Sequence, residues 1–382
     1  MKDAVRYRHG LVFGRFYPPH EGHHRLIETA AARCDRVTVA VIASPEESIP
    51  LADRLAWMRA AHAGQPTVRI VGDHGDQPFD PALVEAVVAR VTIEDRLPPP
   101  AARVDAVFTA RLEGGEVCRR LGAAHVRVDP ERMGAPVRST ALRADVAGHW
   151  RWLRPPARTG LAKRVVVIGS ESTGTTTVSR EIAAALASRG GVWTATGWVA
   201  EYGRAYTEEK LAALAAQAAA AGRRPPTMED LRWTDGDFLT IAERQNADED
   251  MAAAVGSPVL VCDTDAFATG VWYERYLGSR HAGVEAIADR CRHDLYLLTD
   301  HAGVPFEQDG LRDGEHLRPW MTRRFMERMD ETGRPWTVLR GSRSERLAQG
   351  LAAIDRLVAE GWRLAGPALS LASRPDAEIH RI

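Results

Sequence analysis

The sequence predicts an α/β protein with two domains, each built around a parallel sheet. The first half of the chain alternates short apolar runs with helical patterns, and a second series of the same kind begins after Pro155-Pro156. Strands separated by helices are typical of parallel sheets with right-handed crossovers. At 382 residues the chain also exceeds the usual size of one domain. We therefore expect one domain over residues 1–155, a second over 163–365 and a loose tail over 366–382.

The expected strands follow from the apolar runs, taken in order along the chain. In the first domain they lie at residues 11–13, 37–42, 68–71, 104–108 and 126–128. In the second domain they lie at 165–168, 192–196, 259–262, 295–298 and 336–339. An alanine-rich stretch at 211–221 predicts a helix, because alanine has the highest helix propensity and Gly222 follows as a stop signal. Between the domains, Pro155-Pro156 marks the boundary.

Composition argues against several classes of protein. The formal net charge of -1 gives no electrostatic case for a nucleic-acid partner, because such proteins normally carry a basic field. No stretch approaches the roughly 20 apolar residues that a membrane-spanning helix needs, so we expect no membrane partner. The 4 cysteines are widely scattered and form no CxxC pair, which is typical of a reducing compartment. We place the protein in the cytoplasm, with small-molecule partners, and a homo-oligomer is compatible with the sequence.

A phosphate-binding motif is predicted at the end of the first strand. It reads Gly14-Arg15-Phe16-Tyr17-Pro18-Pro19-His20-Glu21-Gly22-His23, and a helix begins near Gly22. A helix N-terminus offers unpaired N–H groups and the positive end of its dipole to an anion. His20 and His23 would face the same anion and stabilise charge on a phosphorus centre under attack. The alternative is a surface loop with incidental histidines, and the preceding strand, glycine, arginine and prolines favour the phosphate site.

A second segment predicts another anion pocket in the same domain. Ser139 and Thr140 open a helix, and Arg143 follows one turn later. Two hydroxyl groups and a guanidinium at this spacing can bind phosphate oxygens. The alternative for the two hydroxyls is an ordinary helix N-cap.

The second domain opens with a P-loop. The sequence Gly169-Ser170-Glu171-Ser172-Thr173-Gly174-Thr175-Thr176 follows a strand and starts a helix that continues through Thr177. The two glycines let successive N–H groups face the phosphates, and Thr176 occupies the position of the hydroxyl that coordinates Mg2+. Thr175 stands where a P-loop carries the lysine that reaches the β- and γ-phosphates.

The substitution at Thr175 predicts a severe defect in phosphoryl transfer. Losing one preorganised donor to a transition state costs roughly 3 kcal/mol, or about 100- to 1000-fold in rate. Another cation could replace the lysine, and the candidates in helix or lid positions are Arg180, Arg204, Arg312 and Arg318. Lys163 precedes the strand, so we expect it at the far end of that strand.

At these residues the sequence resembles the nucleotidyltransferase superfamily marked by a His-x-Gly-His element. More narrowly, it resembles the bifunctional NadR family over almost the whole chain; this family joins nicotinamide mononucleotide (NMN) adenylyltransferase to ribosylnicotinamide kinase. Its second adenylyltransferase signature, of the Ile-Ser-x-Thr-x-Ile-Arg type, is matched by Val137-Arg138-Ser139-Thr140-Ala141-Leu142-Arg143. The resemblance implies a Rossmann-like nucleotidyltransferase domain followed by a P-loop kinase domain, with ATP and Mg2+ as cofactors.

The resemblance also implies roles for residues of the first domain. His20, His23 and Arg15 would attend the α-phosphate of ATP, while Ser139, Thr140 and Arg143 would hold the β- and γ-phosphates. The NMN phosphate would then attack the α-phosphorus directly, so positioning and electrostatics would perform the catalysis. Two further segments resemble the family and make Trp57 and Arg132 substrate-side candidates. A core tryptophan beside a solvated Arg54, and an ordinary turn, are their alternatives.

In the second domain the resemblance implies a riboside pocket. Asp263 would engage the riboside hydroxyls and act as general base, and Asp265 would be a second carboxylate for substrate or magnesium. Glu201-Tyr202-Gly203-Arg204 and Asp309-Gly310-Leu311-Arg312 match family segments of the substrate pocket and lid. A helix cap is the alternative for the strand-ending Asp-Thr-Asp. Four tryptophans could stack on a ligand ring but are more often core: Trp193, Trp198, Trp233 and Trp272.

Several functions remain open at this point. The leading prediction is adenylyl transfer from ATP to NMN, with a kinase half that phosphorylates nicotinamide riboside if another cation replaces the lysine. The kinase-like half could instead be a non-catalytic nucleotide sensor, and the first domain could be a nucleotidyltransferase for another acceptor. A transcriptional repressor is disfavoured, because only about ten residues precede the first strand and leave no room for a helix-turn-helix.

Overall fold

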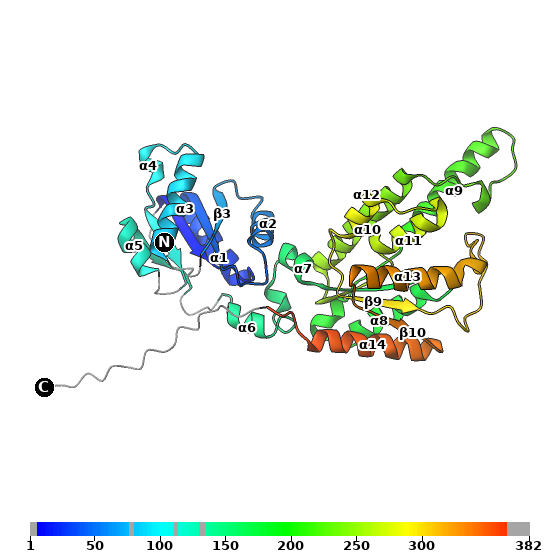
Figure 1. Ribbon diagram of the computed structural model, residues 1–382. Coiled ribbons are helices and arrows are strands. Elements are labelled where there is room, and N and C mark those ends of the chain that lie inside the picture. Colours follow the sequence, from blue (N-terminus) through cyan, green and yellow to red (C-terminus); the bar gives the residue numbers. More distant parts are fainter. Residues whose placement is uncertain (1–5, 76–79, 111–113, 130–133, 365–382) are drawn as a thin grey trace. The chain divides into compact units, whose positions relative to one another are not determined.

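The computed structural model describes residues 6–75, 80–110, 114–129 and 134–364. These residues form two compact units, the first reaching Gly160 and including 362–364, the second covering Leu161–Gly361. Figure 1 follows both units along the chain. Each unit is built on one parallel sheet of five strands, which confirms the predicted fold class. The tail predicted at 366–382 lies outside the described residues.

The sheet of the first unit has the strand order β3-β2-β1-β4-β5. Its strands are β1 (Tyr7–Gly14), β2 (Cys34–Ala43), β3 (Val68–His74), β4 (Ala106–Thr109) and β5 (Ala124–Arg127). β1 is paired with β2 on one side and β4 on the other, so the strand order reverses beside it. In parallel sheets, ligands bind at the carboxyl ends of the strands next to such a reversal. This topology places the end of β1 at the expected position of a site.

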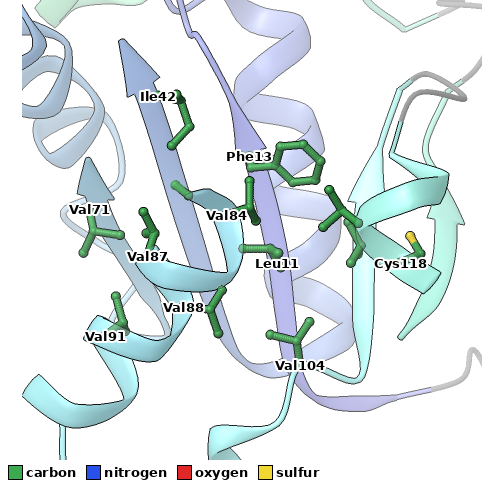
Figure 2. Close-up of a cluster of buried hydrophobic side chains, with 13 residues drawn as sticks. Leu11, Phe13, Ile42, Val71, Val84, Val87, Val88, Val91, Val104 and Cys118 are labelled. Carbon is green, nitrogen blue, oxygen red and sulfur yellow. The ribbon is translucent and has the colours of Figure 1, made fainter. Parts of the chain in front are cut away.

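Helices cover both faces of this sheet. The helices of the first unit are α1 (Glu21–Arg33), α2 (Leu51–Ala61), α3 (Pro81–Glu94), α4 (Pro99–Ala102), α5 (Gly115–Leu121), α6 (Ser139–Ala144), η1 (Trp150–Trp152) and α7 (Pro155–Leu161), and the first five pack against the sheet. α3 places Val84, Val87, Val88 and Val91 on one side of the helix, and they pack against the strands around Leu11 (Figure 2). The spacing of these valines matches one face of a helix, so their burial holds α3 against the sheet.

The second unit repeats the architecture with the strand order β10-β9-β6-β8-β7. Its strands are β6 (Lys163–Gly169), β7 (Trp198–Val199), β8 (Val259–Asp263), β9 (Leu295–Thr299) and β10 (Trp336–Leu339). Its helices are α8 (Thr175–Ala187), η2 (Gly191–Ala195), α9 (Tyr202–Ala220), η3 (Met228–Asp230), α10 (Asp235–Val255), α11 (Ala266–Leu277), α12 (Ala282–Ala288), η4 (Glu315–Leu317), α13 (Arg318–Thr332) and α14 (Arg343–Ala359). β6 is central, so the loop after it opens beside the ends of β8 and β9.

One local prediction is wrong. The run at 192–196 is the 3-10 helix η2 rather than a strand, because Gly190 and Gly191 at φ 75° and 58° turn the chain before it. The edge strand β7 lies further on and pairs with β8. Pro155-Pro156 begins α7, where a proline loses no helical hydrogen bond, and the division between the two units follows within this helix, after Gly160. The predicted helix at 211–221 is confirmed and begins earlier, at Tyr202.

No helix among the described residues is both long and apolar enough to cross a bilayer.

Candidate active sites

The first predicted site lies where β1 ends and α1 begins. His20 is the N-cap of α1 and is buried, and its backbone N–H donates to His23 Nδ1 at 3.3 Å. The two imidazole rings stack with their centroids 3.7 Å apart, and the edge of Phe16 supports His23. The ring pair is therefore fixed at the end of the strand, beside the N–H groups that open α1.

The second predicted segment, Ser139 to Arg143, lies in contact with this histidine pair. Ser139 begins α6, and its Oγ lies 3.0 Å from His20 Nε2, although the two residues are 119 positions apart. Arg143 Nη1 donates to the carbonyl oxygen of Tyr17 at 2.9 Å, which holds the guanidinium beside the same loop. Burial lowers the pKa of Arg143, but an arginine remains protonated at neutral pH. Thr140 is exposed beside Ser139.

A buried carboxylate positions the arginine that follows Gly14. Glu47 accepts from Arg15 Nη1 at 2.7 Å and from Arg54 Nη1 at 2.6 Å. Arg54 is completely buried and also donates to the carbonyl oxygens of Arg15 and Ile49. The alternative of a solvated Arg54 is therefore wrong. Glu47 and Arg54 were not predicted as site residues; the segment Arg54-Leu55-Ala56-Trp57 is a sequence signal for Arg54 but not for Glu47.

The two substrate-side candidates of this unit have different outcomes. Trp57 is half-buried and packs against α7, since a methyl group built on Gly160 would lie 2.2 Å from its Cζ2. This contact gives the indole a packing role within the unit. Arg132 lies outside the described residues.

Gly22 makes room for the His20 ring. A Cβ atom at position 22 would lie 3.1 Å from His20 Cε1 and 3.2 Å from Nδ1, tighter than ordinary packing. We expect Gly22→Ala to displace the imidazole by a few tenths of an ångström and lower kcat/KM of the first site about 10- to 100-fold. Steady-state assays would measure this loss. Gly115→Ala is the matched control, because a Cβ there meets no atom of the described residues within 4 Å. Equal activity of the two variants would contradict the assignment of His20.

The P-loop of the second unit is confirmed as a strand, loop and helix. Gly169 ends β6, and a Cβ atom there would lie 2.2 Å from Thr299 Oγ1 and 2.5 Å from Thr173 Oγ1, so only glycine fits. Gly174 is the N-cap that precedes α8, with φ at 85°, and Thr177 lies in the first turn of that helix. Thr173 turns inward and bonds Thr299 Oγ1 at 2.7 Å. As expected, Lys163 lies at the opposite end of β6.

The side chain at the magnesium position contacts the strand-ending aspartate. Thr176 Oγ1 donates to Asp263 Oδ2 at 2.6 Å. Asp263 Oδ1 is buried without a hydrogen-bond partner among the described residues. Burial raises the pKa of Asp263 to about 6, although the hydroxyls of Thr176 and Thr175 and the charges of Arg180 and Arg204 oppose that shift. An orphaned carboxylate oxygen beside a threonine hydroxyl suits Mg2+, which prefers oxygen ligands.

A pocket opens over these residues. Its wall combines the P-loop, carboxylates, arginines and aromatic side chains, including Gly169, Ser170, Glu171, Ser172, Thr175, Thr176, Glu201, Arg204, Trp233, Phe238, Asp263, Thr264, Trp272, Tyr276 and Arg312. Burial, and then the nearby Asp263 carboxylate, raise the pKa of Glu201 to about 7. Trp233 and Trp272, left open by the sequence, line this pocket, whereas Trp193 and Trp198 pack against the core.

Two predicted residues of this unit do not face the pocket. Asp265 is completely buried, caps α11 by accepting from Ala268 N–H at 2.8 Å, and also accepts from Tyr296 Oη. A ligand carboxylate must be accessible, so its prediction as a substrate or magnesium residue is wrong and the helix-cap alternative is correct. Tyr202 packs instead against Tyr206 and under the guanidinium of Arg244.

Asp265 belongs to a buried charge network that the sequence did not reveal. His293 Nε2 lies 2.8 Å from Glu249 Oε2, and its Nδ1 lies 3.3 Å from Asp265 Oδ2. The two carboxylates raise the pKa of His293 against the opposing effect of burial. Since Asp265 begins α11, this network fixes the helix that carries Trp272 and Tyr276 into the pocket.

The four arginines that could replace the P-loop lysine differ in their contacts. Arg318 is buried and donates to the carbonyl oxygens of Val304, Ser172 and His301, so it supports the loop and its prediction as a phosphate cation is wrong. Arg180 lies over the Trp198 ring at 4.3 Å. Arg204 and Arg312 line the pocket together with Thr175.

Two family models match the chain, one in each unit. A cytidylyltransferase-like model matches residues 11–90, and an AAA domain model matches residues 164–346. The first covers β1, α1 and the histidine pair, and the second covers the P-loop and the pocket.

Known proteins match across both units. The trifunctional NAD biosynthesis/regulator protein NadR of Escherichia coli (strain K12) is 25% identical over 322 residues, which cover 79% of this chain and 71% of that protein. The NadR protein of Salmonella typhimurium is 25% identical over 324 residues. A crystal structure of NadR with NAD and AMP-PNP has a TM-score of 0.66 at 18% identity, covering 93% of this chain and 98% of that one. A NadR structure with NR gives 0.65 at 19% identity, covering 94% and 98%.

Fold and sites together define a nucleotide-dependent transferase that joins a nucleotidyltransferase-like unit to a P-loop unit. The relatives narrow this class, because they match over both units in the same order. The chain is a NadR-like protein, which confirms the resemblance drawn from its motifs.

Proposed function

We propose that the first unit transfers adenylate from ATP to NMN and produces NAD and pyrophosphate. The observation that carries this proposal is the meeting of His20 and Ser139, which brings two separately predicted anion-binding segments into one site. Arg143, held by the carbonyl oxygen of Tyr17, and Arg15, held by Glu47, contribute guanidinium groups from the same loop region. A site with this distribution of donors fits a triphosphate whose α-phosphorus lies near the histidines.

The proposed chemistry needs no protein nucleophile. An oxygen of the NMN phosphate forms a bond to the α-phosphorus of ATP, and the bond from that phosphorus to the α,β-bridging oxygen breaks. Pyrophosphate leaves with the electron pair. His20 and His23 donate to the oxygens on which negative charge increases, while Ser139, Thr140 and Arg143 hold the leaving β- and γ-phosphates. Magnesium, when bound, would neutralise part of the phosphate charge.

The second unit is proposed to phosphorylate nicotinamide riboside. Its pocket pairs an aromatic wall with acidic groups, and this combination suits a flat, positively charged nicotinamide ring and ribose hydroxyls. Asp263 would accept the proton of the 5'-hydroxyl, whose oxygen forms the new bond to the γ-phosphorus. The bond to the β,γ-bridging oxygen breaks, and ADP leaves with the electron pair. Thr176 would hold the magnesium ion, which would supply charge neutralisation at the phosphates.

Both products can be measured on the intact chain. NMN with ATP should give NAD and pyrophosphate, and in a separate reaction nicotinamide riboside with ATP should give NMN and ADP. Failure of the first reaction would overturn the function proposed for the first unit. Failure of the second alone would leave adenylyl transfer standing. We place these reactions in the cytoplasm, and the 4 free cysteines, of which Cys34, Cys118 and Cys262 are buried, support a reducing compartment.

The rate of riboside phosphorylation should depend on the ionisation of Asp263. Its pKa is raised to about 6, so the carboxylate that accepts the proton is lost as the pH falls through that value. We expect kcat/KM for riboside to fall roughly tenfold for each pH unit below about 6 and to level off above it. A pH–rate profile with the buffer ionic strength held constant would measure this. A profile that stays flat between pH 5 and 8 would contradict the role of Asp263 as base.

The second candidate function of the P-loop unit is that of a nucleotide sensor. It is favoured by Thr175, because this residue stands where a P-loop kinase carries the lysine that reaches the β- and γ-phosphates. A sensor binds ATP or NAD without transferring the γ-phosphate. Nucleotide binding with no riboside turnover in the wild-type chain, and turnover in Thr175→Lys, would support the sensor over the kinase.

A further inference from the structure

The pocket of the second unit has a loop that is attached to the P-loop at both ends. Ser172 Oγ donates to the carbonyl oxygen of Glu307 and accepts from the N–H of Glu307, both at 3.1 Å. Gly314 N–H donates to Glu171 Oε2 at 2.8 Å. The segment 307–314 therefore begins and ends on two neighbouring P-loop residues, and we name it the strap.

The strap is also fixed from the side. Arg275 on α11 pairs with Glu171 Oε1 at 3.1 Å and with Asp313 of the strap. The Arg275 side chain is 3% exposed and lies over the rings of Trp272 and Tyr276, which line the pocket. Its charge is therefore used in contacts with the strap and with these two rings. The position of the strap relative to the P-loop is thus set by three separate contacts.

Arg312 is the strap residue whose cation faces the pocket. Within the described part of the chain its side chain makes one hydrogen bond, from Nη1 to the carbonyl oxygen of Glu307 at 2.9 Å. Its nearest carboxylate oxygens, on Glu307 and Asp309, lie at 3.6 and 3.7 Å. A guanidinium has five N–H donors, so Arg312 keeps donors for an anion in the pocket that it lines together with Thr175.

Arg204 lines the same pocket but is held differently. It donates to Asp309 at 2.8 Å and lies 3.3 Å from Glu208, so two carboxylates already neutralise it. Arg204 and Arg312 both lower the pKa of Glu201, so their ion pairs, and not their distance from the acidic wall, distinguish them. Arg346 donates to the carbonyl oxygens of Thr173 and Asp300, so it supports the backbone of the P-loop.

We propose that Arg312 takes the place of the missing P-loop lysine and binds the terminal phosphate of ATP. Arg312 would bring its positive charge to the phosphate from the strap, whereas a lysine at position 175 would do so from the first turn of α8. The assignment of a riboside as the second substrate rests on the proposed function, but the recognition of the γ-phosphate by Arg312 does not. A cation that contacts this phosphate distinguishes a triphosphate from a diphosphate.

The test compares binding of AMP-PNP and ADP to the full chain by calorimetry in the presence of Mg2+, fitted with two nucleotide sites, of which the site of the first unit should be unchanged in every variant. Arg312→Gln should weaken AMP-PNP binding about 10- to 100-fold and change ADP binding by less than about threefold, because a charge-assisted contact to one phosphate is lost. Arg189→Gln is the matched control, since Arg189 pairs with Asp355 on the surface and its loss should change neither affinity. Arg312→Lys should retain part of the preference for AMP-PNP.

A second arm asks whether a lysine in the usual position restores the contact. Thr175→Lys in the Arg312→Gln background should recover the preference for AMP-PNP to within about tenfold of the wild type. An unfolding transition of the second unit that matches the wild type, followed by the fluorescence of its tryptophans, reports that each variant is folded. The proposal would be overturned if Arg312→Gln lost affinity equally for AMP-PNP and ADP. It would also be overturned if the loss of AMP-PNP affinity were no larger than in Arg189→Gln. Absence of riboside turnover alongside an Arg312-dependent preference would instead refute only the proposed kinase function.

Discussion

Replacing His23 by alanine is expected to lower the rate of NAD formation from NMN and ATP by about 100- to 1000-fold. The ring of His23 stacks on His20 with the centroids 3.7 Å apart and is supported by Phe16. Its loss removes one donor from the transition state and leaves His20 without its neighbour. The loss should fall on kcat more than on KM, because the charge that the imidazole stabilises develops during the reaction.

The control for this prediction is His316→Ala, which removes an exposed imidazole from the second unit. Its rate of NAD formation should match that of the wild type. Steady-state kinetics with varied NMN and ATP separate kcat from KM for both variants. A His23 variant that kept kcat and only raised KM would show that the imidazole binds ground-state phosphate, and the catalytic role would be wrong.

Asp263→Asn is expected to reduce riboside phosphorylation by roughly 100- to 10,000-fold, the usual range for a lost general base. The amide keeps the size of the side chain and can still accept from Thr176, whose hydroxyl lies 2.6 Å from Asp263 Oδ2. It cannot take the proton of the 5'-hydroxyl, and it carries no charge for a magnesium ion. NAD formation from NMN by the first unit should be unchanged.

The same substitution should not cost stability. The folded-state pKa of Asp263 is raised to about 6, so its ionisation at higher pH opposes folding. A neutral asparagine removes that cost, and the free energy of unfolding at pH 8 should stay equal or rise by up to about 3 kcal/mol. Urea unfolding followed by fluorescence would measure it. Loss of activity together with a marked loss of stability would assign Asp263 a structural role instead.

The fold and the polar loops could be predicted from the sequence because their signals are local. An apolar run predicts a strand, and the glycine after Val12-Phe13 or Val167-Ile168 predicts where the backbone turns. The histidine pair and the P-loop are contiguous motifs. Their positions at strand ends follow from the parallel topology, and both sheets have it.

The supporting side chains could not be predicted because their partners are distant in sequence. Glu47 acts by joining Arg15 to Arg54, and nothing in its local sequence distinguishes it from a surface glutamate. Asp265 was misassigned for a related reason: its neighbour Asp263 faces the pocket, whereas Asp265 turns back to cap α11. Propensity also failed at 192–196, where two glycines with positive φ override an apolar run.

The most direct test of the central claim follows the phosphates of ATP through the first reaction. The purified chain is incubated with NMN and ATP that is radiolabelled either at the α-phosphate or at the γ-phosphate. The proposed attack on the α-phosphorus predicts that the α-label enters NAD and that the γ-label appears only in pyrophosphate. No labelled NAD from α-labelled ATP, in a preparation that binds ATP, would contradict adenylyl transfer to NMN.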